Sequence, residues 1–452
     1  MDKEENTQSH DRAEPDNVRE MTVTRRRFMR GAAAAGGLAA FGSPLGDVFP
    51  THSDILSMNA YARETATMNE FEPNMIGPYG PWAASLAGDT PQTMSFRRSN
   101  IRKADLKTWR EAARQRVVDR LAIPAVNAAP SVTVGKTYTY NGLHVEELTW
   151  RLPWGRPTEA LLLKPENATG RLPGILAFHD HGGNKYFGAR KITRTADSRH
   201  PLMEEHQSMY YSGRAWANEI AKRGYVVLVS DTFPFASRRV MMADVPESIR
   251  QGLNDNDPEK PDNIAAYNQW AGAHESIMAK SLFCAGTTWP GVFFAEDKAA
   301  LDILCARDDV DAGNIGCGGL SGGGMRTVFA GGLDPRIRCA VCVGFMSTWR
   351  DFLLYKSFTH TWMTYVPLLP NEMDFPEILG LRVPLPTLVL NDADDDLYTL
   401  PEMRRADTIL RAVYDKADAG DRYRCSFYPG EHKFDADMQK EAFDWFDYWL
   451  KG

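Results

Sequence analysis

Cysteine is scarce in this sequence, with six residues in 452. So few thiols exclude a disulfide-dense scaffold, although one disulfide remains possible. A basic excess is also missing, because 52 lysines and arginines stand against 59 aspartates and glutamates, giving a formal charge of −7. The chain therefore lacks the electrostatic footprint of a nucleic-acid-binding protein and should be weakly repelled by anionic membranes. Internal repeats are absent, and the 43% hydrophobic and 25% charged residues are typical of a globular protein.

The spacing of the cysteines does not indicate a redox or metal motif. Cys339 and Cys342 come closest to a C-x-x-C pair, but they lie in an apolar run that predicts a buried strand. Residues three apart on a strand point to opposite faces, so we interpret most cysteines as small core residues. With no H-E-x-x-H or Cys/His cluster either, we expect no metal and no cofactor.

Residues 1–42 are expected to be a twin-arginine export signal. The segment TRRRFMR at 24–30 precedes an Ala/Gly-rich run at 31–41. A charged segment followed by a short, weakly apolar run is the pattern of a secretory signal, and the run is too mild to span a bilayer. The sequence therefore predicts a periplasmic or secreted protein that engages the twin-arginine (Tat) export machinery. A disordered basic tail is the alternative, and the cleavage site stays open.

The rest of the chain predicts an extended N-terminal arm at 43–100 and one folded domain at 101–452. Alternating patterns predict a helix at 103–121, antiparallel strands at 131–140, 143–152 and 159–164, and then short runs that are apolar on both faces at 174–178, 225–229, 315–320, 339–343 and 386–390. Helical segments separate these runs, and a strand at 423–428 and a helix at 436–450 close the domain. The pattern indicates an α/β fold with a mostly parallel central sheet flanked by helices. The long polar stretch at about 236–289 is expected to be a lid-like insertion.

A serine stands at the sharpest motif, Gly319-Leu-Ser321-Gly-Gly323, between a predicted strand and a predicted helix. In that context G-x-S-x-G forms a tight turn that exposes the serine Oγ above the sheet at the positive end of the helix. The N–H of Gly322 can then point at a developing oxyanion. The alternative is a glycine-rich turn without chemistry.

A serine nucleophile needs a base and a carboxylate that orients the base. Asp395 follows the strand that ends near 390, and His432 is the only histidine after it. Both lie in loops at the carboxyl edge of the predicted sheet, in the chain order Ser, Asp, His. Asp394 and Asp396 stay open for the same role, because a shift of one residue would exchange them. A solvated acidic turn and a surface histidine are the alternatives.

The second oxyanion donor is expected in the loop His179-Asp-His-Gly-Gly-Asn184, which follows the strand at 174–178. We predict the N–H of His181, or else that of Gly182, beside Gly322. The rival hypothesis makes His179, Asp180 and His181 metal ligands.

A family resemblance rests on three runs, LPGILAFHDHGG at 172–183, TWPG at 288–291 and the stretch 309–321 that ends in Ser321. Together they resemble α/β-hydrolases of the dienelactone hydrolase and acetyl xylan esterase type over roughly residues 100–450. The resemblance implies a Ser321–Asp395–His432 triad that hydrolyses carboxylic esters through an acyl-enzyme. Two departures stand out: dienelactone hydrolases use cysteine where this chain has Ser321, and relatives often carry His-Gly at Asn391-Asp392.

These observations predict an exported serine esterase acting on a small-molecule or carbohydrate ester, with carbohydrate deacetylation suggested by family analogy. Four aromatic residues could line a sugar or acyl site: Trp289, Tyr186, Phe187 and Trp362. The alternative for each of them is a place in the hydrophobic core. The alternatives are a peptidase of the prolyl oligopeptidase kind, disfavoured by the absence of propeller repeats, and a non-catalytic binding module. The oligomeric state and the acyl group stay open.

Overall fold

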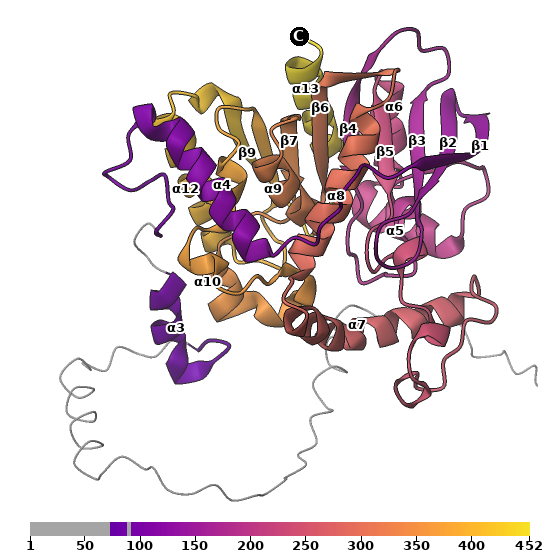
Figure 1. Cartoon of the computed structure of the whole chain (residues 1–452), viewed down its shortest axis with the longest axis horizontal. Helices are drawn as coiled ribbons and strands as arrows, with labels where there is room; N and C mark the ends of the chain where they lie inside the picture. Colours follow the sequence, from indigo (N-terminus) through magenta and orange to yellow (C-terminus); the bar gives the residue numbers. More distant parts are fainter. Residues whose placement is uncertain (1–72, 88–91) are drawn as a thin grey trace, which may run out of the picture. The chain divides into compact units, whose positions relative to one another are not determined.

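The computed structural model describes residues 73–87 and 92–452, which belong to one compact unit spanning 71–452. Its centre is a nine-stranded sheet in the order β1-β2-β3-β5-β4-β6-β7-β8-β9 (Figure 1). The strands are β1 (Val132–Tyr140), β2 (Leu143–Trp150), β3 (Thr158–Pro165), β4 (Leu172–Phe178), β5 (Val226–Ser230), β6 (Val310–Leu320), β7 (Ile337–Val343), β8 (Thr387–Asp392) and β9 (Tyr423–Tyr428). The predicted export signal, 1–42, lies outside the described residues.

The strands divide into an antiparallel and a parallel part. β1, β2, β3 and β5 pair antiparallel, whereas β5, β4, β6, β7, β8 and β9 pair parallel. This arrangement confirms the predicted hairpin strands and the mostly parallel sheet. Because parallel strands end at the same edge, the loops after β4, β6, β8 and β9 come together there.

Helices cover both faces of the sheet, and Figure 1 views it from the side of α4 and α8. Apart from α3, which is described below, the α-helices of seven or more residues in the described part of the chain are α4 (Leu106–Leu121), α5 (Pro201–Tyr211), α6 (Trp216–Lys222), α7 (Pro261–Cys284), α8 (Trp289–Cys305), α9 (Gly322–Leu333), α12 (Leu400–Lys416) and α13 (Ala436–Leu450). One core joins α4, α8, α9 and α12 to the sheet, and a second core joins α6 and α13 to its other face. Strand β4 shows why its sequence is apolar throughout: Leu176 and Phe178 enter the first core, and Ile175 and Ala177 enter the second.

The cysteines of β7 also divide between the two cores. Cys342 packs in the first core and Cys339 in the second, so the two residues point to opposite faces of β7 as predicted. All six cysteines are free thiols. Burial raises the pKa of both Cys339 and Cys342, which keeps them protonated and unreactive.

Two segments lie outside the regular alternation of strands and helices, the predicted N-terminal arm and the insertion at 236–289. The predicted arm is not extended throughout, because η1 (Gly77–Tyr79) and α3 (Gly80–Ala87) are helical. The insertion at 236–289 starts with short helical turns and continues as α7, a 24-residue helix. Within the described part of the chain, no helix combines the length and apolar character needed to cross a bilayer.

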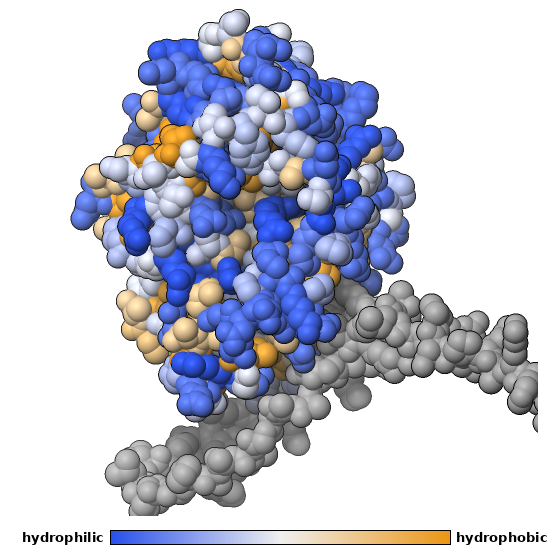
Figure 2. All heavy atoms as spheres, turned by 90° about the vertical axis from the view of Figure 1, so that its right-hand side faces the viewer, coloured by the Kyte–Doolittle hydropathy of each residue, from blue (hydrophilic) through white to orange (hydrophobic). Residues whose placement is uncertain are grey.

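Strand β1 forms one edge of the sheet and is exposed along most of its length. Figure 2 shows the side of the molecule on which β1 lies, and hydrophilic residues dominate that face. Polar side chains on an edge strand discourage pairing with other chains, because an exposed row of backbone groups is otherwise a template for aggregation.

Candidate active site

Ser321 lies in the turn between β6 and α9 with φ 58° and ψ −115°. A non-glycine residue in this region is strained, and such strain at a strand-to-helix turn is a mark of functional sites. The turn is held from below, because Ser321 N–H donates to the carbonyl of Val343 at 2.9 Å. The serine therefore stands at the carboxyl edge of the sheet, next to the first N–H groups of α9, where negative charge is stabilised.

The glycines of the motif are required by the close approach of β4. A Cβ on Gly319 would lie 2.3 Å from the carbonyl oxygen of Phe178, and one on Gly323 would lie 2.6 Å from the same atom. Side chains at either position would force the turn away from β4. The G-x-S-x-G spacing thus lets the serine turn pack directly against the end of the neighbouring strand.

Asp395 and His432 are in direct contact at the same edge. Asp395 follows β8 and His432 follows β9, and the Asp395 Oδ2 lies 2.5 Å from the His432 Nδ1. The other carboxylate oxygen accepts the N–H of Leu397 at 2.9 Å. Both side chains are nearly inaccessible to solvent, with exposed fractions of 1% and 4%. Asp394 and Asp396 are exposed instead, so the structure brings Asp395, rather than its neighbours, to the histidine.

The His432 ring lies beside the strand end that holds the serine turn. Its ring packs against Gly344, where a Cβ would lie 3.1 Å from the His432 Cε1, and Gly344 directly follows Val343, the acceptor for Ser321 N–H. The His432 Nε2 is buried and has no hydrogen-bond partner in the described residues. Hydrogen bonds between nucleophile and base are often long in a free enzyme and tighten with substrate bound. The unused Nε2 is therefore the atom that can accept a proton.

The loop after β4 brings His181 beside Gly322. A Cβ on Gly322 would lie 3.1 Å from the backbone nitrogen of His181, so the two backbone segments are in contact. Gly182 has φ +50°, and a Cβ there would lie 2.4 Å from the Asp180 Oδ2. Glycine is therefore needed at 182 for both conformation and space. The predicted donors Gly322 and His181 lie together, and Gly182 shapes the loop that carries His181.

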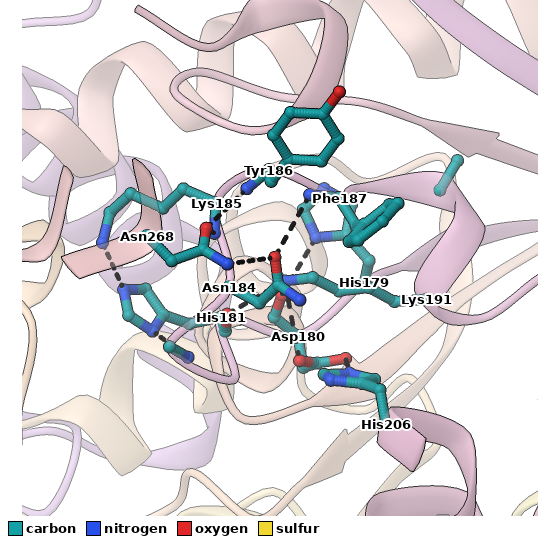
Figure 3. Close-up of polar contacts among 12 residues, drawn as sticks. His179, Asp180, His181, Asn184, Lys185, Tyr186, Phe187, Lys191, His206 and Asn268 are labelled. Atoms are coloured by element: carbon teal, nitrogen blue, oxygen red, sulfur yellow. Dashed lines mark hydrogen bonds and ion pairs between the residues drawn. The ribbon is translucent and has the colours of Figure 1, made fainter. Parts of the chain in front are cut away.

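A buried polar network holds this loop (Figure 3). Asp180 accepts hydrogen bonds from Tyr211 Oη at 2.5 Å and His206 Nε2 at 3.1 Å. The Lys191 Nζ donates to the carbonyls of Asp180 and His181 at 2.8 and 2.9 Å. Burial would raise the pKa of Asp180, but His206 and Lys191 hold it well below its usual range. The network fixes the backbone on either side of the His181 N–H.

His179, Asp180 and His181 do not form a common ligand set. The His179 Nδ1 bonds the Asp180 carbonyl, the Asp180 side chain turns to His206, and the His181 ring turns to Glu275. In the described residues, the group whose ligand atoms lie within 4.8 Å of one another is Asp392, Asp395 and His432. Since Asp395 and His432 bond each other directly, this cluster fits a proton-transfer pair better than a metal centre.

Asp392 is a third carboxyl beside that pair. Its Oδ2 accepts the N–H of Lys433 at 3.0 Å, and its buried Oδ1 has no partner in the described residues. Burial raises the pKa of Asp392 to about 7. It occupies a position where relatives often carry glycine, so the departure noted in the sequence places an extra acid against the histidine loop.

The aromatic residues predicted to line a substrate site, Trp289 and Tyr186, are buried. Trp289 is 1% exposed and packs in the sheet core with its ring 5.5 Å from that of Phe233, because it starts α8 against β4 and β5. Tyr186 and Phe187 are also buried, in a small cluster with α7. Trp362, in contrast, is 45% exposed. The burial of Trp289, Tyr186 and Phe187 fits the alternative of a core role, and a substrate-binding role for Trp289 and Tyr186 stays a prediction.

Several residues at the site escaped the sequence reasoning. Glu275 on α7 contacts His181 at 2.9 Å, although it lies 94 residues away along the chain. Lys191 and His206 lie 10 and 26 residues after their partners in the loop, and no local signal identifies them. Asp392 did have a signal, the replaced glycine, but its burial could not be inferred.

Comparisons with known proteins found one curated relative and several solved structures of similar fold. No family model matches the chain. A Bacillus subtilis protein named "Putative hydrolase YtaP" is 27% identical over 309 residues, which is 68% of this chain and 88% of that protein. Among solved structures, one named as a putative acetyl xylan esterase of Bacteroides fragilis is 18% identical, covers 80% of this chain and 84% of its own, and has a TM-score of 0.58. A glucuronoyl esterase of Solibacter usitatus is 15% identical, with 76% and 93% covered and a TM-score of 0.50.

At this level of identity the likeness to solved structures shows the fold. The chain has the α/β-hydrolase fold, with a mostly parallel central sheet flanked by helices. The predicted fold class is confirmed.

Proposed function

We propose that this protein is a serine hydrolase that cleaves carboxylic esters through an acyl-enzyme. One observation carries the proposal: a strained serine at φ 58° lies on the sheet edge where a buried Asp395–His432 pair leaves the histidine Nε2 unpaired. The hydrolase name of the Bacillus subtilis relative and the esterase names of the structural neighbours support the same reaction class.

In the proposed mechanism Ser321 is the nucleophile and His432 the general base. As Ser321 Oγ attacks the ester carbonyl, the His432 Nε2 takes its proton and later gives it to the leaving alcohol. Asp395 accepts the Nδ1–H at 2.5 Å, which fixes the ring tautomer and stabilises the imidazolium. Water then attacks the acyl-enzyme while the His432 Nε2 takes its proton. His432 returns that proton to the Ser321 Oγ as the carboxylic acid is released.

The negative oxygen of each tetrahedral intermediate would lie between the N–H groups of Gly322 and His181. A fixed donor of this kind contributes about 3 to 4 kcal/mol of transition-state stabilisation. Because Lys191 and Asp180 hold the His181 loop, the donor requires little reorganisation when charge develops.

For the substrate we propose an ester of a carbohydrate or of a small molecule, with carbohydrate deacetylation first among these. The first support is the acetyl xylan esterase and glucuronoyl esterase names of the neighbours. The second is the proposed export of the protein by the twin-arginine signal at residues 1–42, which would bring the enzyme to extracellular polymers. Fusing residues 1–42 to a reporter that requires folded export tests the latter, with an Arg25→Lys, Arg26→Lys, Arg27→Lys variant as control.

The test of the reaction is Ser321→Ala, assayed with p-nitrophenyl acetate and with a panel of acetylated sugars, glucuronate esters and peptides. The variant should fold, as judged by circular dichroism, and lose ester hydrolysis by at least about a thousandfold. Ester turnover by Ser321→Ala equal to that of the unchanged protein would contradict the proposal. If the unchanged protein cleaves peptides in preference to esters, the activity is that of a peptidase instead.

A further inference from the structure

We propose that Glu275, on the inserted helix α7, is a positioning residue for the oxyanion hole, so that the insertion acts as a fixed brace of the active site. The inference rests on the proposed function, because it gives a role to the His181 N–H in that reaction. It changes the expectation of a lid-like segment at 236–289, since a lid must be able to leave the residues it covers.

The first support is the set of contacts made by the Glu275 carboxylate. Its Oε1 lies 2.9 Å from the His181 Nε2 and 2.5 Å from the Lys185 Nζ. Its Oε2 accepts the Thr361 Oγ1 at 2.6 Å and the Trp362 N–H at 3.0 Å. One side chain thus joins the oxyanion loop, the inserted helix and the loop at 361–362. Figure 3 shows the His181 ring and Lys185 facing each other within this cluster.

Burial makes these contacts strong. Glu275 is 6% exposed and Lys185 is 1% exposed, so water competes little with the ion pair. Burial opposes ionisation, but Lys185 and His181 together hold the pKa of Glu275 below its usual range. A buried carboxylate with four donors is fully satisfied and rigid, whereas loss of its charge leaves Lys185 without a counter-ion.

The hydrogen bonds also fix the orientation of His181. Its Nδ1 accepts the N–H of Gly183 at 3.1 Å, and its Nε2 lies 2.9 Å from the Glu275 Oε1 and 3.3 Å from the Lys185 Nζ. With Nδ1 as acceptor, the neutral tautomer that fits carries its proton on Nε2 and donates it to Glu275. Burial, followed by the charge of Lys185, lowers the pKa of His181, which keeps the ring neutral. A neutral ring held at both nitrogens fixes the side chain whose backbone N–H is the proposed oxyanion donor.

A second residue of α7 holds the same loop. Asn268 lies two helical turns before Glu275 and therefore on the same face. Its Oδ1 accepts the N–H groups of Lys185 and Tyr186, both at 2.9 Å, and its Nδ2 donates to the Asn184 Oδ1 at 3.0 Å. The loop is consequently fastened to α7 at two points, one at each end of its Gly-Gly turn.

The consequence for the reaction follows from how strictly catalysis depends on position. A displacement of about 1 Å in a catalytic group can cost about a hundredfold in rate. Releasing the His181 ring would let its backbone N–H move away from Gly322. The expected signature is a lower kcat with a nearly unchanged KM, because the oxyanion exists in the transition state and not in the bound ester.

The test is Glu275→Gln, which removes the charge and keeps the volume. We expect kcat for ester hydrolysis to fall by about tenfold to a hundredfold, with KM changed less than about threefold, at equal folded fraction. The matched control is Glu146→Gln. Glu146 is also a buried glutamate in an ion pair, with Arg307 at 2.9 Å, but Arg307 precedes β6, at the opposite end of the strand from Ser321. The control should lose stability and keep kcat.

Hydrogen exchange supplies a readout independent of turnover. The backbone amides of 181–186 should exchange faster in Glu275→Gln than in the unchanged protein and in Glu146→Gln. If the unchanged protein hydrolyses esters and Glu275→Gln retains its kcat, the brace role is refuted while the esterase proposal stands. If no ester is hydrolysed, the esterase proposal fails, and unchanged exchange at 181–186 would then refute the brace as well.

Discussion

The carboxyl of Asp392 should make the protein less stable as the pH rises. Burial raises the pKa of Asp392 from 3.8 to about 7 in the folded protein, whereas in the unfolded chain it stays near 3.8. Between these values the folded state binds a proton that the unfolded state has released. The free energy of unfolding therefore falls as the pH increases, and the full loss is reached above pH 7.

The magnitude follows from the pKa difference. At about 1.4 kcal/mol per pKa unit, ionising Asp392 in the folded state costs about 4 kcal/mol in all. About 3 kcal/mol of this lies between pH 5 and pH 8.5. An Asp392→Asn variant keeps an acceptor for the Lys433 N–H and removes the titration. Its stability relative to the unchanged protein should thus improve by about 3 kcal/mol between these two pH values.

The assay is urea unfolding at pH 5, 6, 7 and 8.5, with the free energy of unfolding compared between the two proteins at each pH. Asp418→Asn is the control, because the Asp418 side chain is 72% exposed and the variant loses the same formal charge. Parallel curves for Asp392→Asn and the unchanged protein would refute the reasoning, because they would mean that Asp392 ionises equally easily in both states.

The remaining predictions concern the proposed site and the core. Asp395→Asn should lower kcat by about four orders of magnitude with little change in KM, because the wrong His432 tautomer is favoured; a loss below tenfold in steady-state kinetics would contradict the pairing. Gly322→Ala should reduce kcat by about tenfold to a hundredfold, since the new Cβ would lie 3.1 Å from the His181 nitrogen and crowd the oxyanion site; a variant as active as the unchanged protein would argue against a hole there. Trp289→Ala should cost about 3 to 5 kcal/mol of stability in denaturant unfolding and leave KM unchanged once corrected for folded fraction, whereas a raised KM would return Trp289 to the substrate site.

Local pattern predicted most of the secondary structure. Short runs apolar on both faces mark strands covered by helices on each side, and each of the five such runs forms a strand of the parallel sheet. The serine turn and the chain order of Ser321, Asp395 and His432 were also legible, because each lies directly after a strand and parallel strands end at one edge. The structure brings Asp395 and His432 into contact, while their catalytic roles stay a prediction.

Tertiary structure alone decided what surrounds these residues. Glu275 and Lys191 contact the oxyanion loop from segments whose sequence carries no motif. Trp289, which the sequence offered as a possible substrate-binding aromatic residue, is buried in the core. The helix α3 was missed because its eight residues are fewer than the roughly 11 to 18 over which helical periodicity can be recognised. The physical reason is one of range: periodicity and turn chemistry act between neighbours in the chain, whereas burial, ion pairs and pKa shifts depend on which distant segments meet.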